Sequence, residues 1–554
     1  MFKIILILLF FTLSIFSRNI SLNEINNYPK SIAKDFYIWQ YLQQPWVSKE
    51  NAEFVFKQVS RSTPKLRKAL KRRGGIQQLK SKSCKILSIP AIMKTQSIKC
   101  VKSNLTPKRV TFLDGAVLRK LIVHFKKIDK DLTLLLMAIY YSQDIEKTLY
   151  SNPEIYLDIF LNSGSKFRKS KKINKILSKR FIQKLVIHSK KFEKFVENII
   201  AYPTRFAPLK KALLNLEPSK KMTNRTLFTL AFNLIKNGQD KRAVKFFKFA
   251  KQNGWFQIYK DMATFWLYLT TKNKQYLQEL LKSWDINIYT LYAREELKRD
   301  FPSNILSHTN FYKFKSTFTP NINPNNPFDW IKVKREINKF KKNQNQLIDF
   351  ANMFKNIEHI GIHFYILERG FKFKKQSFPT PYRKYLSKLS IYDQAQIYAL
   401  ARQESKFIPS VVSTSYALGM MQIMPFLVKD IAKRKGEKIE LEAMFNPIKN
   451  LEYSIFHLQT LKKQFISPLF IAYAYNGGGG FTRRMLKSGM FSKGKYEPFL
   501  SMETVSFSET RKYGKKVLAN YVVYRRLLNK PISLHHLLSD LTQPTKSDFI
   551  RKRK

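Results

Sequence analysis

The chain is poor in acidic residues and cysteine, and it has no long apolar run. Its 554 residues include 38 Asp and Glu against 101 Lys and Arg, and its only cysteines are Cys84 and Cys100. So sparse a pair excludes a disulfide scaffold, while a single disulfide and two buried thiols both remain open. The apolar run at residues 4–16 is shorter than the about 20 residues that a membrane-spanning helix needs. With 44% hydrophobic and 14% aromatic residues, the chain is expected to fold, and its length of 554 residues favours more than one domain.

The formal net charge of +63 would attract polyanions and acidic surfaces. The basic residues are spread along the whole length, and no motif that reads nucleic-acid bases is present, so no specific nucleic-acid partner is expected. A general lysine-rich composition explains the charge equally well. His359 and His363 have a spacing that could hold a metal on a helix, but Gly361 lies between them and no Glu follows His359. We therefore expect no metal and no cofactor.

The N-terminus is typical of a secretory signal. Lys3 precedes the apolar run and Ser17 places a small residue at its end, so cleavage near Ser17 and a periplasmic location are expected. Retention of the run as a membrane anchor is the open alternative.

The sequence predicts an all-α chain. Apolar residues recur at helical spacing from about residue 19 to residue 300, and strand-like alternation is scarce. The clearest hairpin joins predicted helices at 226–237 and 241–253 through Asn237 and Gly238, and another is predicted at 261–284. Because such hairpins bury their apolar faces by stacking, an N-terminal α-superhelical array is expected. The predicted domains are a signal peptide at 1–17, the superhelix at 18–300, a connector at 301–377, a mainly helical domain at 378–545 and a basic tail at 546–554.

Residues 399–425 carry the strongest indication of chemistry. Ser390 is the predicted N-cap of a helix whose apolar positions Ile397, Leu400 and Ala401 share a face with Glu404. A carboxylate on an apolar face resists ionisation, so its pKa should rise and it can serve as a general acid near neutral pH. The alternative is a solvent-exposed Glu, or one paired with Arg402 or Lys406.

The residues that follow offer a binding loop without a second acid. No Asp or Glu occurs at 405–429. Ser413 and Gln422 supply polar groups, Gly419 permits close backbone approach, and Met424 adds a soft apolar surface. Pro425 is predicted to open the next helix and Gly436 to end it. Further helices are predicted at 450–465, from Pro468 into a flexible loop of four glycines at 477–480, and at 508–528.

Four blocks stand in one order: Glu404-Ser405, GMMQIMP at 419–425, AYNG at 474–477 and FSETR at 507–511. Together, over about residues 380–530, they resemble the catalytic domain of the soluble lytic murein transglycosylases. The resemblance implies a lysozyme-like catalytic domain that cleaves peptidoglycan between N-acetylmuramic acid and N-acetylglucosamine without water, leaving 1,6-anhydromuramic acid. It also implies that Glu404 acts as general acid and then base. Implied substrate contacts are Ser413, Gln422, Met424, Tyr475 and Glu509, and implied loop supports are Gly419 and Asn476.

One departure from the family pattern concerns Tyr416, Ala417 and Leu418, which stand before Gly419 where small residues are common. The expected partners are peptidoglycan glycan strands, with other cell-wall enzymes as further candidates. A hydrolytic muramidase is the alternative enzyme, and it would need a second carboxylate, for which distant Asp430, Glu503 and Glu509 are candidates. A non-catalytic wall-binding scaffold is the alternative of another class, although a scaffold needs no acid at position 404.

Overall fold

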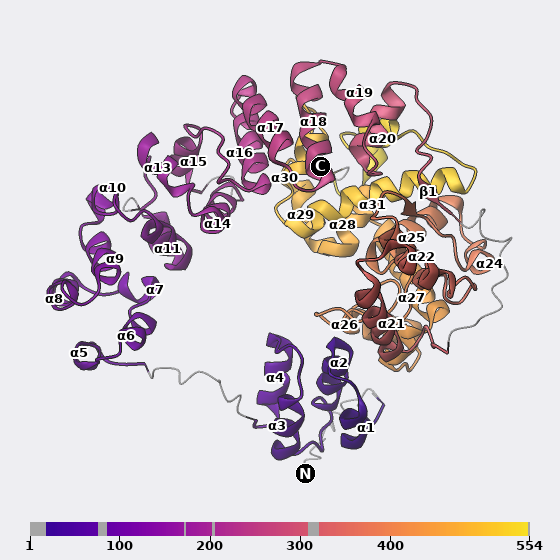
Figure 1. Ribbon diagram of the computed structural model, residues 1–554, viewed down its shortest axis with the longest axis horizontal. Coiled ribbons are helices and arrows are strands. Elements are labelled where there is room, and N and C mark those ends of the chain that lie inside the picture. The colour runs from indigo at the N-terminus through magenta and orange to yellow at the C-terminus, as the bar shows by residue number, and fades with distance from the viewer. Residues whose placement is uncertain (1–17, 76–85, 171–172, 202–204, 308–320, 552–554) are drawn as a thin grey trace, which may run out of the picture. The chain divides into compact units, whose positions relative to one another are not determined.

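The computed structural model describes residues 18–75, 86–170, 173–201, 205–307 and 321–551 (Figure 1). The predicted signal peptide at 1–17 and Cys84 lie outside these residues, so the signal stays a prediction. Of the two alternatives left open for the cysteines, the structure gives Cys100 as disulfide-bonded. Within the described ranges the named strands are β1 (Ile305–Leu306) and β2 (Gln376–Ser377), which pair in parallel, and helices form the rest of the regular structure. The all-α prediction is confirmed. In these same ranges no helix has the length and apolar character needed to cross a membrane.

The chain divides into two compact units. Unit 1 comprises residues 1–78, 301–492 and 512–554, and unit 2 comprises residues 79–300 and 493–511. The predicted boundaries, which place residues 18–300 in one domain, remain a proposal.

Unit 2 is a succession of helices, each packed on a neighbour in the chain. The predicted hairpin at 226–253 is confirmed as α16 and α17, and Gly238 in its turn has a φ of +71°. Trp266 lies at the centre of their packing, with its ring centroid 4.9 Å from that of Phe232 and 5.6 Å from that of Phe247. The helices are α5 (Ile89–Lys94), α6 (Ile98–Asn104), α7 (Pro107–Val110), α8 (Gly115–Phe125), α9 (Lys130–Tyr140), η1 (Ser142–Asp144), α10 (Ile145–Thr148), α11 (Glu154–Asn162), α12 (Ser165–Lys169), α13 (Lys179–Leu185), α14 (Ser189–Ile200), α15 (Ala207–Leu213), α16 (Asn224–Lys236), α17 (Asp240–Asn253), α18 (Gln257–Thr271), α19 (Gln275–Leu281), α20 (Ile288–Glu296) and α30 (Phe499–Thr504).

The short helix α30 belongs to unit 2 although it is far from the other helices in sequence. Phe499 packs against Phe265, with ring centroids 4.7 Å apart, and the buried Tyr289 hydroxyl donates to Glu503. The segment 493–511 therefore completes the core of the helical array.

Unit 1 combines the N-terminal helices, the connector and most of the C-terminal part. Its helices are α1 (Leu22–Asn27), α2 (Ile32–Tyr41), α3 (Lys49–Lys57), α4 (Pro64–Arg72), α21 (Pro327–Phe340), α22 (Gln344–Asn352), α23 (Ile360–Gly370), α24 (Arg383–Leu386), α25 (Ile391–Glu404), α26 (Pro425–Lys435), η3 (Leu441–Phe445), α27 (Pro447–Lys462), α28 (Pro468–Gly477), α29 (Gly479–Lys487), α32 (Leu534–Asp540) and α33 (Pro544–Ser547). The long helix α31 (Ser508–Leu527) begins in residues of unit 2 and continues in residues of unit 1.

Local signals fixed several helix ends in unit 1. Ser390 accepts a hydrogen bond from the backbone N–H of Asp393 and begins α25, as predicted. Pro425 begins α26 and Gly436, with a φ of +68°, ends it. The predicted flexible loop of four glycines is wrong. Gly477 ends α28 and α29 begins at Gly479, so Gly478 alone, with a φ of +87°, separates two helices.

The connector packs into the same core as the chain after Glu404. Trp330 and Val333 of α21, Leu347 of α22 and Ile362 of α23 are buried together with Ile408. At Gly361 an added Cβ would lie 2.3 Å from the carbonyl oxygen of Phe407, so only glycine allows α23 to approach this closely. The connector therefore supports the backbone that immediately follows Glu404.

Candidate active site

Glu404 is the last residue of α25. The helix is buried over its final three turns, and Glu404 itself is half-buried at the end. The hydroxyl of the buried Tyr513, from α31, donates a hydrogen bond of 2.6 Å to Oε1 of Glu404. Position 404 thus carries a carboxylate that is held by a buried phenol.

Tyr475 also lies near this carboxylate. Burial, and then the charge of Glu404, raise the pKa of Tyr475 and hold the pKa of Tyr513 well above its usual value. Both phenols are therefore protonated at neutral pH and can donate. The Tyr475 hydroxyl donates to the carbonyl oxygen of Met421 at 2.8 Å, which connects α28 to the loop after Glu404.

Tyr513 is absent from the predicted set of site residues. It is one of 27 tyrosines, and no spacing from Glu404 could single it out across more than a hundred residues of chain. Its place near the start of the helix predicted at 508–528, from which it can reach a neighbouring groove, is the one signal that pointed to it.

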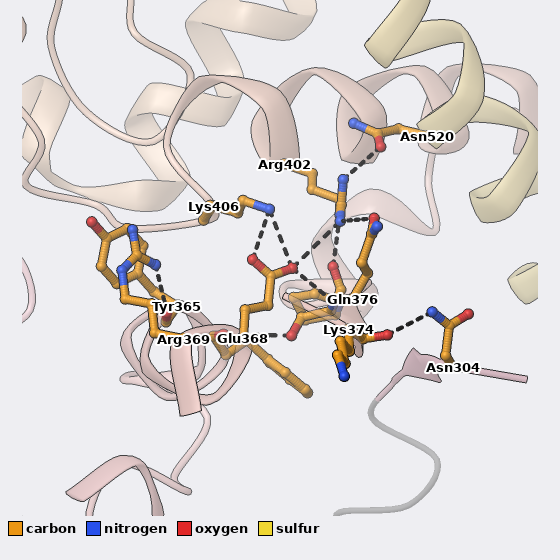
Figure 2. A network of polar contacts seen from close by, with 12 residues as sticks. Asn304, Tyr365, Glu368, Arg369, Lys374, Gln376, Arg402, Lys406 and Asn520 are labelled. Carbon is orange, nitrogen blue, oxygen red and sulfur yellow. Dashed lines mark hydrogen bonds and ion pairs between the residues drawn. The ribbon is translucent and has the colours of Figure 1, made fainter. Parts of the chain in front are cut away.

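Arg402 and Lys406, the two cations that could pair with Glu404, both bind Glu368 of α23. Figure 2 shows the Glu368 carboxylate between them. Lys406 Nζ lies 2.9 Å from Glu368 Oε2, and Arg402 Nη2 lies 3.4 Å from Oε1. The backbone N–H of Ser377 also donates to Oε1 at 2.8 Å. Although burial opposes ionisation, Lys406 and Arg402 hold the pKa of Glu368 below its usual value.

Arg402 fastens α25 to several other segments. Its Nε donates to the carbonyl oxygen of Ser377 and its Nη1 to Oδ1 of Asn520, both at 2.7 Å (Figure 2). Asn520, on α31, donates in turn to the carbonyl oxygen of Ala399 at 3.2 Å. These bonds fix the last turns of the helix that carries Glu404.

The turn after Glu404 has an unusual backbone. Lys406 and Phe407 both have positive φ values, +60° and +65°. Two consecutive side-chain-bearing residues in the left-handed region cost roughly 1–3 kcal/mol each. The ion pair of Lys406 with Glu368 and the approach of Gly361 to Phe407 supply the contacts that hold this turn.

The loop at 411–424 is folded on itself by its own polar groups. Ser413 Oγ accepts from the N–H groups of Ser415 at 3.2 Å and Ala417 at 2.9 Å. Gln422 Nε2 donates to the carbonyl oxygens of Val411 at 3.0 Å and Gly419 at 2.8 Å. Ser413 and Gln422, predicted as substrate contacts, therefore also build the loop.

Gly419 and Asn450 anchor the same loop. Gly419 has a φ of +76°, and an added Cβ would lie 2.1 Å from the carbonyl oxygen of Met444, so no other residue fits. Asn450 of α27 is fully buried, and its Oδ1 accepts from the N–H of Met421 at 2.7 Å. Asn450 is a further loop support that the sequence analysis missed.

The other predicted residues are distributed as follows. Met424 is half-buried as the N-cap residue of α26, and Asn476 is half-buried in the last turn of α28. Glu509 lies in the first turn of α31, within the segment assigned to unit 2, whereas Glu404 belongs to unit 1. The structure thus brings Glu404, Tyr475 and the 411–424 loop together, and the role of Glu509 stays a prediction.

Two of the three candidates for a second carboxylate make other contacts. Asp430 is exposed on α26 and lies 3.8 Å from Arg434, and Glu503 accepts from Tyr289 in unit 2. Each histidine of the discarded metal pair contacts a backbone carbonyl oxygen at 2.7 Å, His359 that of Ile322 and His363 that of Ala351. Among the residues that the structure describes, no group of three or more His, Cys, Asp or Glu is placed to hold a metal ion.

Comparison with known proteins identifies the region around this site. The family model of the transglycosylase SLT domain matches residues 383–497, which include Glu404, the 411–424 loop and Tyr475. Residues 383–497, called the SLT domain below, are thus similar in sequence to this family.

Curated relatives of this SLT domain share its sequence over a limited length. The soluble lytic murein transglycosylase of Salmonella typhimurium is 34% identical over 151 residues, which is 26% of this chain and 22% of that protein. The Escherichia coli K12 protein of the same name is 34% identical over 166 residues, 28% of this chain and 25% of that protein. The match thus spans about a quarter of the length of these relatives. Among solved structures, an inactive mutant of lytic transglycosylase Slt from Pseudomonas aeruginosa is 15% identical, with a TM-score of 0.49 over 95% of this chain and 86% of that chain.

Proposed function

We propose that this protein is a peptidoglycan lytic transglycosylase and that Glu404 is its catalytic acid and base. The observation that carries the proposal is the half-buried carboxylate of Glu404, which lies inside the SLT domain and accepts a hydrogen bond from Tyr513. The relatives named above are called lytic murein transglycosylases, which supports the same substrate class.

In the proposed reaction, protonated Glu404 transfers its proton to the oxygen of the β-1,4 bond between N-acetylmuramic acid and N-acetylglucosamine. The bond from C1 to that oxygen breaks, and the acetamido group of the muramic acid stabilises the cationic centre. The Glu404 carboxylate then removes the proton of the C6 hydroxyl of the same sugar, and O6 bonds to C1. Glu404 ends protonated as it began, and the product is a 1,6-anhydromuramic acid.

The surrounding residues fit this sequence of steps. Tyr513 donates to the ionised form of Glu404, so it stabilises the carboxylate between the two proton transfers. Tyr475, kept protonated, is placed in the proposal to hydrogen-bond the acetamido group. Ser413, Gln422, Met424 and Glu509 are proposed substrate contacts, and Gly419 and Asn476 proposed loop supports.

A hydrolytic muramidase on the same domain is the second candidate, but no observation favours it. Inverting and retaining glycosidases place two carboxyl groups about 5–9.5 Å apart across the scissile bond. Asp430 and Glu503, two of the candidates, make the other contacts described above. A wall-binding scaffold would not require the Tyr513–Glu404 pair. We further propose a periplasmic location, reached through the N-terminal signal, with peptidoglycan strands as the substrate and other cell-wall enzymes as candidate partners.

The test is mass spectrometry of muropeptides released from purified sacculi. The wild-type protein should release products one water lighter than those of a hydrolase, and Glu404→Gln should release none. Glu336→Gln, which changes an exposed carboxylate on α21, should behave as wild type. Products of full mass with a free reducing end would refute the transglycosylase and favour the muramidase. Binding of sacculi without any release by the wild-type protein would favour the scaffold.

A further inference from the structure

The N-terminal helices contribute aromatic and basic side chains beside the loop that contains Ser413. Trp39 and Phe36 of α2 lie against Tyr416, with ring centroids 5.6 Å and 6.0 Å apart. Gln40 of the same helix donates to Glu442 at 2.8 Å. Residues 18–75 are thus packed on the SLT domain within unit 1, at the point where the sequence departs from the family by carrying Tyr416.

Lys65 of α4 is the basic residue of this contact. Its Nζ lies 4.4 Å from the ring centroid of Trp39 and 5.2 Å from that of Tyr416, and it approaches the carbonyl oxygen of Ser415 at 3.4 Å. Ser415 belongs to the turn that Ser413 Oγ closes. The ammonium group therefore lies within one turn of a proposed substrate contact.

Lys65 has no anionic partner in the part of the chain that the structure describes. Asp35, the acidic residue of α2, accepts instead from the backbone N–H groups of Ser60 at 2.7 Å and Arg61 at 2.9 Å. Lys65 is half-buried, and burial alone lowers its pKa, with no carboxylate opposing that effect. A partly desolvated ammonium over two aromatic faces would gain a charge-assisted hydrogen bond from an anionic ligand.

We propose that Lys65, positioned over Trp39 and the buried Tyr416, forms a binding site for a carboxylate of the glycan substrate, next to the Ser413 turn. The proposal rests on the proposed function, and it makes the N-terminal helices part of substrate recognition. Peptidoglycan offers such a carboxylate in two places, on the stem peptide and, where the peptide has been removed, on the lactyl group of muramic acid.

The test measures binding in the inactive Glu404→Gln protein by isothermal titration calorimetry. The probes are peptide-bearing glycan chains, glycan chains stripped of peptide, and chitooligosaccharides, which have no carboxylate. Lys65→Gln should weaken binding of carboxylate-bearing glycan about tenfold, or about 1.4 kcal/mol, because the ligand loses a charge-assisted hydrogen bond. Lys65→Arg should keep the affinity within about twofold. Lys68→Gln, an exposed lysine of the same helix, should leave it unchanged.

Each outcome decides the proposal. If Lys65→Gln loses affinity only for peptide-bearing glycan, the carboxylate lies on the peptide. If it loses affinity equally for stripped glycan, the carboxylate lies on the lactyl group. An equal loss of affinity for chitooligosaccharides, or no loss of affinity for any probe, overturns the carboxylate site. If the glycan affinity of Lys65→Gln is unchanged while the wild-type protein releases anhydro products, the site is refuted and the proposed function stands. If the wild-type protein neither binds glycan nor releases anhydro products, both fail.

Discussion

The Glu368→Gln substitution should destabilise unit 1 by about 3 kcal/mol. The carboxylate of Glu368 is 1% exposed and faces Arg402, whose side chain is 9% exposed, so the variant leaves a buried guanidinium without its anion. Removing one partner of a buried ion pair typically costs about 3–5 kcal/mol. The lower value is expected because Lys406, the second cation, is 34% exposed and water screens its share.

The matched control is Glu336→Gln, which removes an exposed i, i+3 pair with Lys339 on α21. Exposed pairs contribute about 0–1 kcal/mol, so this variant should stay close to wild type. Urea unfolding followed by circular dichroism gives the free energy of unfolding of both variants, read from the transition of unit 1. Equal midpoints for the two variants would refute the assignment of Glu368 as the residue that fastens α25.

The same pair predicts a dependence on pH. Because the pKa of Glu368 lies below its unfolded value of 4.5, ionised Glu368 stabilises the fold above that pH, and this stability is lost as the pH falls through the folded pKa. The difference between wild type and Glu368→Gln should therefore be full at pH 7 and shrink below about pH 4.5. A difference that grows on acidification would contradict this reasoning.

Three further variants test the site. Tyr513→Phe removes the donor to Glu404 and should lower kcat about tenfold while moving the basic limb of the pH–rate profile to higher pH; an unchanged profile would exclude a role for the hydroxyl. In urea unfolding, Gly419→Ala should lower the free energy of unfolding by over about 1 kcal/mol more than Gly436→Ala does. Both positions have positive φ, but only at Gly419 would an added Cβ lie 2.1 Å from a backbone atom. Equal losses would show that the clash relaxes. Asn450→Ala should lower the free energy of unfolding by about 1–3 kcal/mol and also reduce activity, because it leaves the buried N–H of Met421 without an acceptor. A loss below about 1 kcal/mol would mean that water replaces the amide.

Local features of this chain were predictable from sequence because their causes are local. The cap at Ser390, Pro425 at the start of α26 and Gly436 at its end each act within one turn of helix. The hairpin of α16 and α17 follows from apolar periodicity and the turn at Gly238. The glycine tract was misjudged because glycine permits several backbone conformations, and helix packing selected the helical one at 479–480.

The contacts that fix Glu404 could not be derived in the same way. Arg402 and Lys406 are close to Glu404 in sequence, and periodicity offers no reason for them to prefer Glu368, more than thirty residues earlier in the connector. That choice depends on where α23 packs, and the packing depends on Gly361, where any Cβ would collide with Phe407. The glycine that argued against a metal site between His359 and His363 is therefore the residue that lets α23 bring Glu368 to the end of α25. The close approach of α23 thus gives both cations a buried carboxylate partner in Glu368, while Tyr513 donates to Glu404 from α31.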